Sequence, residues 1–195
     1  MSGLRIIAGK ARGRKLRSVP GDATRPITDR VKENLFNILG ADVQDSTWLD
    51  LFAGTGSVGI EALSRGADFV RFNDLQRQAV DTIHANLRQT GLQAGSEVLR
   101  QDAFHLLTQT ADRSFDYVYI APPQYKELWQ RALLVLDEHS GWLNEDAWVI
   151  VQIHPVEYQP VSLKFLEEFD RRKYGSTLLI FYRKRFPGDT QPATD

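Results

Sequence analysis

The feature that most constrains the fold of this 195-residue chain is a glycine-rich turn at residues 50–59. It reads Asp50-Leu51-Phe52-Ala53-Gly54-Thr55-Gly56-Ser57-Val58-Gly59, and its last six residues fit the pattern G-x-G-x-x-G. An apolar run at 47–52 predicts a buried strand before the turn, and residues 57–65 predict a helix after it. Glycines at this spacing allow a sharp strand-to-helix turn and close approach of a ligand to the backbone.

The rest of the chain alternates between strand-like and helical patterns. Further strands are expected at 69–73, 97–100, 115–120 and 148–153. Further helices are expected from Thr28 to Gly40, over 76–90 and over 126–136, with a short one after 102. This alternation predicts an α/β fold, in which a parallel sheet carries helices on both faces. Two closing strands, at 169–174 and 177–182, are too close together for a helical crossover, so we expect them to be antiparallel.

Composition excludes several kinds of site. The chain has no cysteine, which excludes disulfides, thiolate metal ligands and cysteine nucleophiles. Its four histidines do not show paired metal-ligand spacing, so we expect no metal. The chain has neither an apolar signal segment nor an apolar run of membrane-spanning length, and no evident interface stripe. We therefore expect a cytoplasmic protein without a membrane partner, and a monomer.

Positive charge is concentrated at the N-terminus. Residues 1–32 hold nine Lys or Arg against two acidic residues, although the whole chain has a net charge of −1. Residues 5–9 and 13–16 predict two short strands, and hence a β-hairpin arm. A basic arm on an acidic chain favours contact with a nucleic acid, and the alternative is a solvated charged end.

Acidic residues follow three successive strands and narrow the choice of ligand. Asp74 ends the second strand, where a carboxylate can accept the hydroxyls of a ribose, and Asp102 follows the third, where it can accept an adenine amino group. Asp50 directly precedes the turn, where it would repel a dinucleotide pyrophosphate but favour the ammonium and sulfonium of S-adenosylmethionine. Each acid taken alone is equally well explained as a helix cap or a turn residue, and a nicotinamide-dependent oxidoreductase stays open as an alternative.

Longer motifs now make a family resemblance visible. The N-terminal run is Arg5-Ile6-Ile7-Ala8-Gly9-Lys10-Ala11-Arg12-Gly13-Arg14-Lys15-Leu16. It is followed by Thr24-Arg25-Pro26-Ile27-Thr28-Asp29-Arg30-Val31-Lys32-Glu33 and Leu35-Phe36-Asn37-Ile38-Leu39, and the glycine turn continues as Ile60-Glu61-Ala62-Leu63-Ser64-Arg65-Gly66-Ala67. Over nearly its whole length the chain resembles the RsmD-type methyltransferases, which methylate the N2 amine of a guanine in small-subunit ribosomal RNA.

The resemblance implies a class I methyltransferase fold, which is Rossmann-like. Its seven-stranded, mostly parallel sheet has an antiparallel last strand, and an N-terminal β-hairpin extends from it. We expect an RNA-facing arm at 1–27, a methyltransferase domain at 28–185 and a frayed tail at 186–195. The expected cofactor site comprises Asp50, Phe52, Gly54, Gly56, Asp74, Asp102 and Ala103. The expected contacts to ribosomal RNA, or to an assembling small ribosomal subunit, are Arg5, Lys10, Arg12, Arg14, Lys15, Arg25 and Arg30.

One departure from the family lies after the fourth strand. The family carries Asp or Asn, then Pro-Pro and an aromatic residue, whereas this chain reads Ala121-Pro122-Pro123-Gln124-Tyr125. In the family motif, the first side chain and the first proline carbonyl accept hydrogen bonds from the target amine, which gains positive charge during methylation, and the aromatic ring stacks on the flipped base. Ala121 removes the side-chain acceptor.

The residues expected to act on the target base are therefore Pro122, Pro123, Gln124 and Tyr125. The Gln124 side chain is close enough in sequence to replace the missing acceptor, and Tyr125 could supply the ring one position late. The sequence leaves two interpretations beside that of an active methyltransferase. One is a catalytically weak or inactive relative that binds cofactor and RNA during ribosome assembly, and the other is the oxidoreductase.

Overall fold

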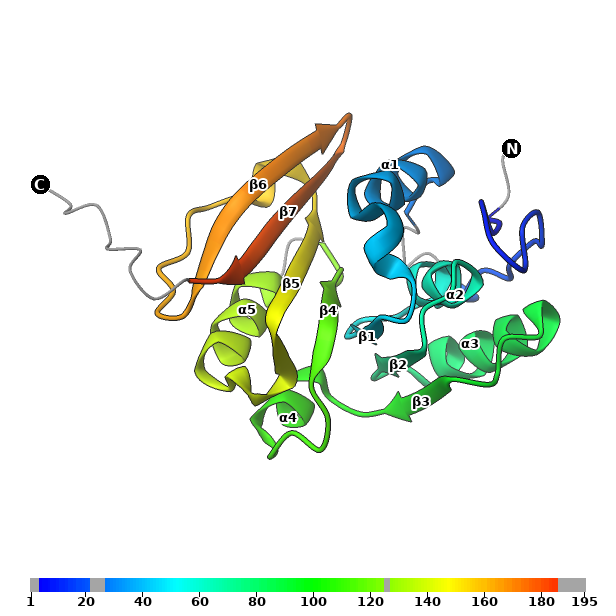
Figure 1. The fold of residues 1–195 in the computed structure, drawn as a ribbon, viewed down its shortest axis with the longest axis horizontal. Helices are drawn as coiled ribbons and strands as arrows, with labels where there is room; N and C mark the ends of the chain where they lie inside the picture. Colours follow the sequence, from blue (N-terminus) through cyan, green and yellow to red (C-terminus); the bar gives the residue numbers. More distant parts are fainter. Residues whose placement is uncertain (1–3, 22–26, 125–126, 186–195) are drawn as a thin grey trace, which may run out of the picture.

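The computed structural model describes residues 4–21, 27–124 and 127–185, and within them one seven-stranded sheet organises the chain (Figure 1). Its strands are β1 (Thr47–Asp50), β2 (Phe69–Asp74), β3 (Ser96–Arg100), β4 (Phe115–Ile120), β5 (Leu143–Ile153), β6 (Leu166–Tyr174) and β7 (Thr177–Lys184). The strand order is β3-β2-β1-β4-β5-β7-β6. Strands β1 to β5 pair in parallel, whereas β7 is antiparallel to both β5 and β6. The expected fold class is thus confirmed.

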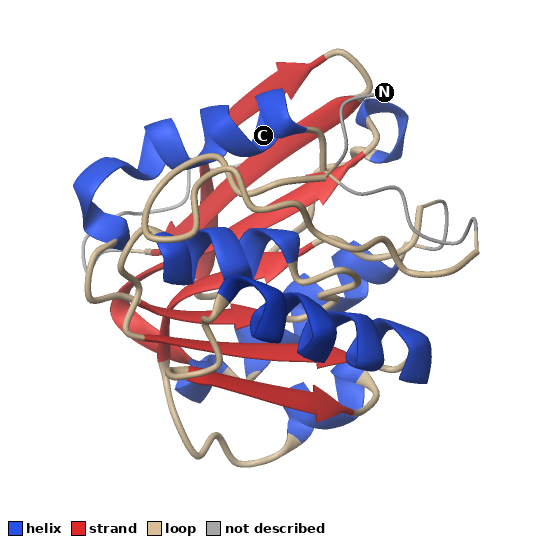
Figure 2. Cartoon of the chain, turned by 90° about the vertical axis from the view of Figure 1, so that its right-hand side faces the viewer, coloured by secondary structure: helices blue, strands red, loops and turns tan. Residues whose placement is uncertain are grey.

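Helices cover both faces of this sheet (Figure 2). They are α1 (Asp29–Leu39), α2 (Ser57–Ser64), α3 (Arg77–Thr90), α4 (Ala103–Thr108) and α5 (Leu128–Glu138), with 3-10 turns η1 (Gly40–Val43), η2 (Ser140–Trp142) and η3 (Pro155–Glu157). Alternate residues of each strand contribute to two apolar clusters, as the pleat requires. Trp48 of β1 packs with α1, α2 and α3, and Leu49 packs with α4 and α5. No helix of the described residues is both long and apolar enough to cross a membrane.

The N-terminal arm folds back on itself but does not form the two strands predicted. Within the described residues, its antiparallel pairing contains one isolated bridge, between Arg5 and Lys15. The reason is that amides on the intervening loop bond to helix α2: Ile7 and Ala8 donate to the Glu61 carboxylate, and Ala11 donates to the Ser64 hydroxyl. The arm is therefore a hairpin-like loop fixed to a helix.

Candidate functional site

The glycine turn connects β1 to α2 in the conformation that its sequence requires. Gly54 and Gly56 have φ values of 55° and 75°, in the left-handed region that disfavours other residues. Gly59 has a different role, because a Cβ atom there would lie 2.3 Å from Cε1 of Phe72 on β2. The first two glycines thus shape the turn, and the third lets α2 pack closely against the sheet.

Asp50 lies at the end of β1, directly beneath this turn. Its side chain is nearly fully buried, with the residue 2 % exposed. Oδ2 accepts a hydrogen bond from the Gly59 amide at 3.3 Å, while Oδ1 is buried without a partner among the described residues. Burial, together with the nearby charge of Asp74, raises the pKa of Asp50 to about 7 against the opposing effect of the Gly59 bond. A buried carboxylate oxygen without a donor is suited to a cationic ligand group.

Asp74 holds the other end of the turn. Its Oδ2 accepts from the Gly54 amide at 2.9 Å, and its Oδ1 accepts from the Gln76 amide at 2.9 Å. Each carboxylate oxygen keeps a further lone pair, so hydrogen bonds to ligand hydroxyls remain possible. Leu75, which sequence reasoning missed, is 60 % exposed beside this carboxylate. In the sequence, the signal for this residue was an apolar side chain directly after an acid that ends a strand. Its exposed side chain offers an apolar surface for a ligand ring.

The third predicted acid has a local structural role. Asp102 Oδ1 caps α4 by accepting from the amides of Phe104 and His105, at 3.0 and 2.9 Å. Its Oδ2 takes no part in the cap, and the residue is exposed. The Ala103 side chain is buried in the core. Phe52 is half-buried in the glycine turn and packs edge-on against Phe104, with ring centroids 6.3 Å apart.

The variant tetrapeptide begins directly after β4. Because β4 pairs with β1 and Tyr119 lies opposite Asp50, this segment leaves the sheet at the same edge as the glycine turn. Ala121, Pro122 and Gln124 are half-buried, and Pro123 is exposed. Tyr125 lies outside the described residues.

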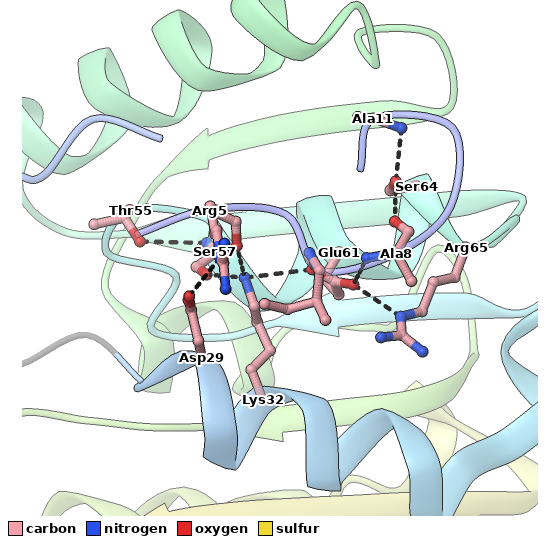
Figure 3. A network of polar contacts seen from close by, with 12 residues as sticks. Arg5, Ala8, Ala11, Asp29, Lys32, Thr55, Ser57, Glu61, Ser64 and Arg65 are labelled. Carbon is pink, nitrogen blue, oxygen red and sulfur yellow. Dashed lines mark hydrogen bonds and ion pairs between the residues drawn. The ribbon is translucent and has the colours of Figure 1, made fainter. Parts of the chain in front are cut away.

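A buried ion pair joins α1 to α2, and its lysine also bonds to the N-terminal arm (Figure 3). The Lys32 ammonium on α1 lies 3.3 Å from Glu61 Oε2 and donates to the Ser57 hydroxyl at 2.9 Å and to the Arg5 carbonyl at 2.6 Å. Both charged side chains are fully buried. Burial lowers the pKa of Lys32, while Glu61 opposes that shift. Lys32 therefore links the arm, α1 and the first turn of α2. From the sequence, Lys32 was counted only as one of the nine basic residues of the segment 1–32.

The basic residues within 4–21 are exposed, and some of them lie at opposite ends of α2. Arg5 lies near the start of α2 and pairs with Asp29 at 2.8 Å. The Lys10 amide, in contrast, donates a hydrogen bond to the carbonyl of Ser64 at the end of α2. Arg12 lies two residues further along the chain. A helix of this length places its two ends roughly 10 Å apart.

The remaining predicted RNA contacts can be located only in part. The Arg14 guanidinium donates to the Gln89 carbonyl of α3 at 3.3 Å, and Gln89 in turn donates to the Lys15 carbonyl. Arg30 is exposed on α1, and Arg25 lies outside the described residues. Among the described residues, no group of three or more His, Asp or Glu side chains is arranged to hold a metal ion.

The strand order with its antiparallel β7, the glycine turn after β1 and the acids after β1 and β2 together define a class I S-adenosylmethionine-dependent methyltransferase. Residues 4–183 match the model of a family described as "Conserved hypothetical protein 95". The chain is 38% identical to the "Putative rRNA methyltransferase YlbH" of Bacillus subtilis, over 93% of this chain and all of that one.

Two further relatives point the same way. Ribosomal RNA small subunit methyltransferase D of Haemophilus influenzae is 39% identical, over 76% of this chain and 78% of that one. A solved structure, "Putative methyltransferase yhhF from Escherichia coli", is 30% identical with a TM-score of 0.82, over 93% of this chain and 97% of that one. The chain therefore belongs to the RsmD-type ribosomal RNA methyltransferase family, as the resemblance predicted, and it is a methyltransferase. The oxidoreductase alternative, which the glycine pattern alone left open, is no longer needed.

Proposed function

We propose that this protein uses S-adenosylmethionine to methylate the N2 amine of a guanine in small-subunit ribosomal RNA. The observation that carries the proposal is the Asp50 carboxylate, buried under the glycine turn with one oxygen unpaired, at the sheet edge where Ala121 and Pro122 leave β4. The names of the curated relatives support ribosomal RNA as the substrate class. The choice of the N2 amine as the methylated atom rests on the resemblance to the RsmD-type enzymes.

The residues at this edge fit the proposed cofactor. The unpaired oxygen of Asp50 meets the need of an ammonium or sulfonium for a negative partner. Asp74 can accept ribose hydroxyls, Leu75 can cover one face of the adenine, and Asp102 Oδ2 can accept from the adenine amino group. Bound there, S-adenosylmethionine supplies a methyl group activated by its positively charged sulfur.

The chain's own task in catalysis is to hold the target amine. As the amine gains positive charge, the Pro122 carbonyl oxygen can accept a hydrogen bond from one of its N–H groups. Ala121 offers no side-chain acceptor. Gln124 remains a candidate acceptor in the turn after Pro123, and Tyr125 remains a candidate stacking ring.

The arm supplies positive charge for the RNA backbone. Arg5 lies near Ser57 at the start of α2 and Arg30 lies on α1, whereas Lys10 and Arg12 lie toward the far end of α2. We propose that the first group contacts phosphates near the target guanine and that the second contacts more distant phosphates.

Methyl transfer tests this function directly. Purified protein, methyl-labelled S-adenosylmethionine and small ribosomal subunits from cells lacking the corresponding methylation should give labelled N2-methylguanine at one position. Label at another atom or in another RNA would overturn the stated specificity.

A second function is favoured by one observation, the alanine at position 121. A relative without useful catalytic activity would still bind S-adenosylhomocysteine and ribosomal RNA. Binding of both ligands without label transfer would support this alternative over the enzyme. Thermal stabilisation by S-adenosylhomocysteine gives the binding measurement.

A further inference from the structure

The fold brings a second amide side chain to the position that Ala121 leaves without an acceptor. Strands β4 and β5 are parallel, and Ile120 lies opposite Val151. Continuing this register by one residue sets Ala121 beside Gln152. The two residues are 31 positions apart in the sequence, so their proximity follows only from strand pairing.

Gln152 also lies on the same face of the sheet as Ala121. Side chains alternate along a strand, and Tyr119 and Ile150 both belong to the apolar cluster under α1, against which Ala121 packs. Gln152 follows Ile150 by two residues, and its side-chain oxygen Oε1 accepts a hydrogen bond from the Tyr119 hydroxyl. That bond, between neighbouring strands, confirms the shared face.

The Tyr119 hydroxyl holds the amide oxygen of Gln152 in place. Tyr119 is nearly fully buried, and burial together with the charge of Asp50 raises its pKa well above the ordinary value. The hydroxyl therefore keeps its proton and stays a donor. A carbonyl oxygen has two lone pairs, so Gln152 Oε1 can accept a second hydrogen bond, and the residue is half-buried rather than sealed in the core.

We propose that Gln152 accepts a hydrogen bond from the exocyclic amine of the target base and so replaces the side-chain acceptor that Ala121 lacks. The inference rests on the proposed function. As the methyl group leaves sulfur, an N–C bond forms at the amine and the surplus proton passes to water. Gln152 takes no proton: its oxygen stabilises the positive charge that develops on nitrogen. Tyr119 is a positioning residue that acts through Gln152.

The test compares methyl transfer to undermethylated small ribosomal subunits by the parent protein and by Gln152→Leu, which removes the amide but keeps the volume. We expect kcat to fall on the order of 100–1,000-fold, as for loss of one preorganised hydrogen-bonding group. Dissociation constants for S-adenosylhomocysteine and for ribosomal RNA should stay within about twofold, because Gln152 is proposed to act on the amine alone.

Restoring the family side chain separates a catalytic from a structural role. Adding Ala121→Asn to Gln152→Leu should recover at least about tenfold of the lost kcat, because an amide returns to the first position of the motif, directly after β4. Gln152→Glu, which keeps an acceptor of the same shape, should remain active. Tyr119→Phe should lower kcat less than Gln152→Leu and leave the cofactor affinity unchanged. The control is Gln109→Ala, an exposed glutamine at the end of α4, which should match the parent protein.

The outcomes distinguish this inference from the proposed function. A parent protein that binds both ligands but transfers no methyl group overturns the proposed function and this inference with it. An active parent together with an equally active Gln152→Leu overturns the inference alone, as does a loss that falls on Gln124→Ala instead. A loss in Gln152→Leu that Ala121→Asn does not relieve also overturns it.

Discussion

The three acidic side chains proposed to bind the cofactor lie in sharply different environments. Asp50 is buried with one oxygen unpaired, whereas Asp74 has both oxygens bonded to backbone amides and Asp102 caps a helix while exposed. Three acids that look equivalent in the sequence therefore have different electrostatic roles. The sequence indicated all three positions, because each lies at or just after the end of a strand, but only the burial of Asp50 beneath the turn and α2 explains why its pKa is raised.

The raised pKa of Asp50 predicts a pH dependence of cofactor binding. A cationic ligand group binds the ionised carboxylate, and with a pKa of about 7 the ionised fraction rises about tenfold between about pH 6 and about pH 8. The affinity for S-adenosylhomocysteine, which keeps the ammonium, should rise by a similar factor over this range. Isothermal titration calorimetry measures it. Asp50→Asn should bind more weakly with little pH dependence, and an unchanged pH dependence in that variant would assign the effect to another group.

The same pKa has a consequence for stability. The folded pKa of Asp50 lies above its ordinary value of 3.8, so folding favours the protonated form, and stability is lost as pH rises through about 7. Asp50→Asn stays neutral, so its unfolding free energy should exceed that of the parent by as much as about 4 kcal/mol at about pH 8 and differ little at about pH 4. Urea denaturation at both pH values checks this. A destabilised variant at the higher pH would contradict it.

At the scale of elements, local sequence patterns predicted most helices and strands, but long-range contacts determine the conformation of the N-terminal arm. Within the described residues, the sequence pattern located each α-helix and each strand of the sheet to within two residues, except that β5 begins at Leu143 rather than 148 and β6 at Leu166 rather than 169. Two strands predicted in the arm are absent because Glu61 and Ser64, more than fifty residues away, bind its amides. No local pattern could reveal a partner at that distance.

The buried Lys32–Glu61 pair predicts that the arm and the domain unfold together. Lys32→Met removes the fully buried one of the two cations that contact the Glu61 carboxylate and leaves Arg65, 2.8 Å away, as the other, so the cost in unfolding free energy should reach at most the about 3–5 kcal/mol typical of a broken buried pair. Urea denaturation gives the value, and trypsin should cleave the variant faster after Arg12. The matched control is Arg77→Met, which removes an exposed pair with Asp81 and should cost less than about 1 kcal/mol. Equal effects of the two variants would refute the linking role of Lys32.

The packing of α2 on β2 predicts the effect of enlarging its third glycine. In Gly59→Ala, the new Cβ would lie 2.3 Å from the Phe72 ring and 2.8 Å from Val70, both fully buried, so we expect α2 to shift away from β2 together with the glycine turn. Overpacking of this kind costs about 1–3 kcal/mol in stability. Binding of S-adenosylhomocysteine should also weaken, because the shift moves the Gly59 amide from Asp50. Gly141→Ala is the control, since its Cβ would make an ordinary 3.5 Å contact.

At the scale of the whole molecule, the acidic residues of the proposed cofactor site and the basic residues of the arm lie in two different parts of the chain. The sheet edge gathers the acids that suit a cationic cofactor, and the arm along α2 and α3 exposes the basic residues. The sequence indicated this division through its charge asymmetry. It could not reveal that Lys32 is buried, that Arg5 is paired with Asp29, or that Gln152 adjoins Ala121, because each depends on tertiary or strand pairing.

The exposed arm predicts a salt-dependent affinity for RNA. Each phosphate contact releases about one counterion, so Lys10→Ala and Arg12→Ala should each reduce the slope of log affinity against log salt by about 1. Filter binding to small-subunit ribosomal RNA over a salt series measures the slope. Lys164→Ala, an exposed charge just before β6 and remote from the arm in sequence, should leave it unchanged. If all three variants kept the slope of the parent protein, the RNA would have to bind to another surface.

The central claim is that Asp50 binds the methyl donor and that Gln152 binds the guanine amine that receives the methyl group. The most direct measurement is the mapping of labelled nucleotides in small-subunit ribosomal RNA after incubation with the parent protein and methyl-labelled S-adenosylmethionine. The account predicts one labelled guanine, methylated at N2, with the initial rate of labelling strongly reduced in Asp50→Asn and Gln152→Leu. Label transfer that survives both substitutions, or that falls on another kind of atom, would contradict it.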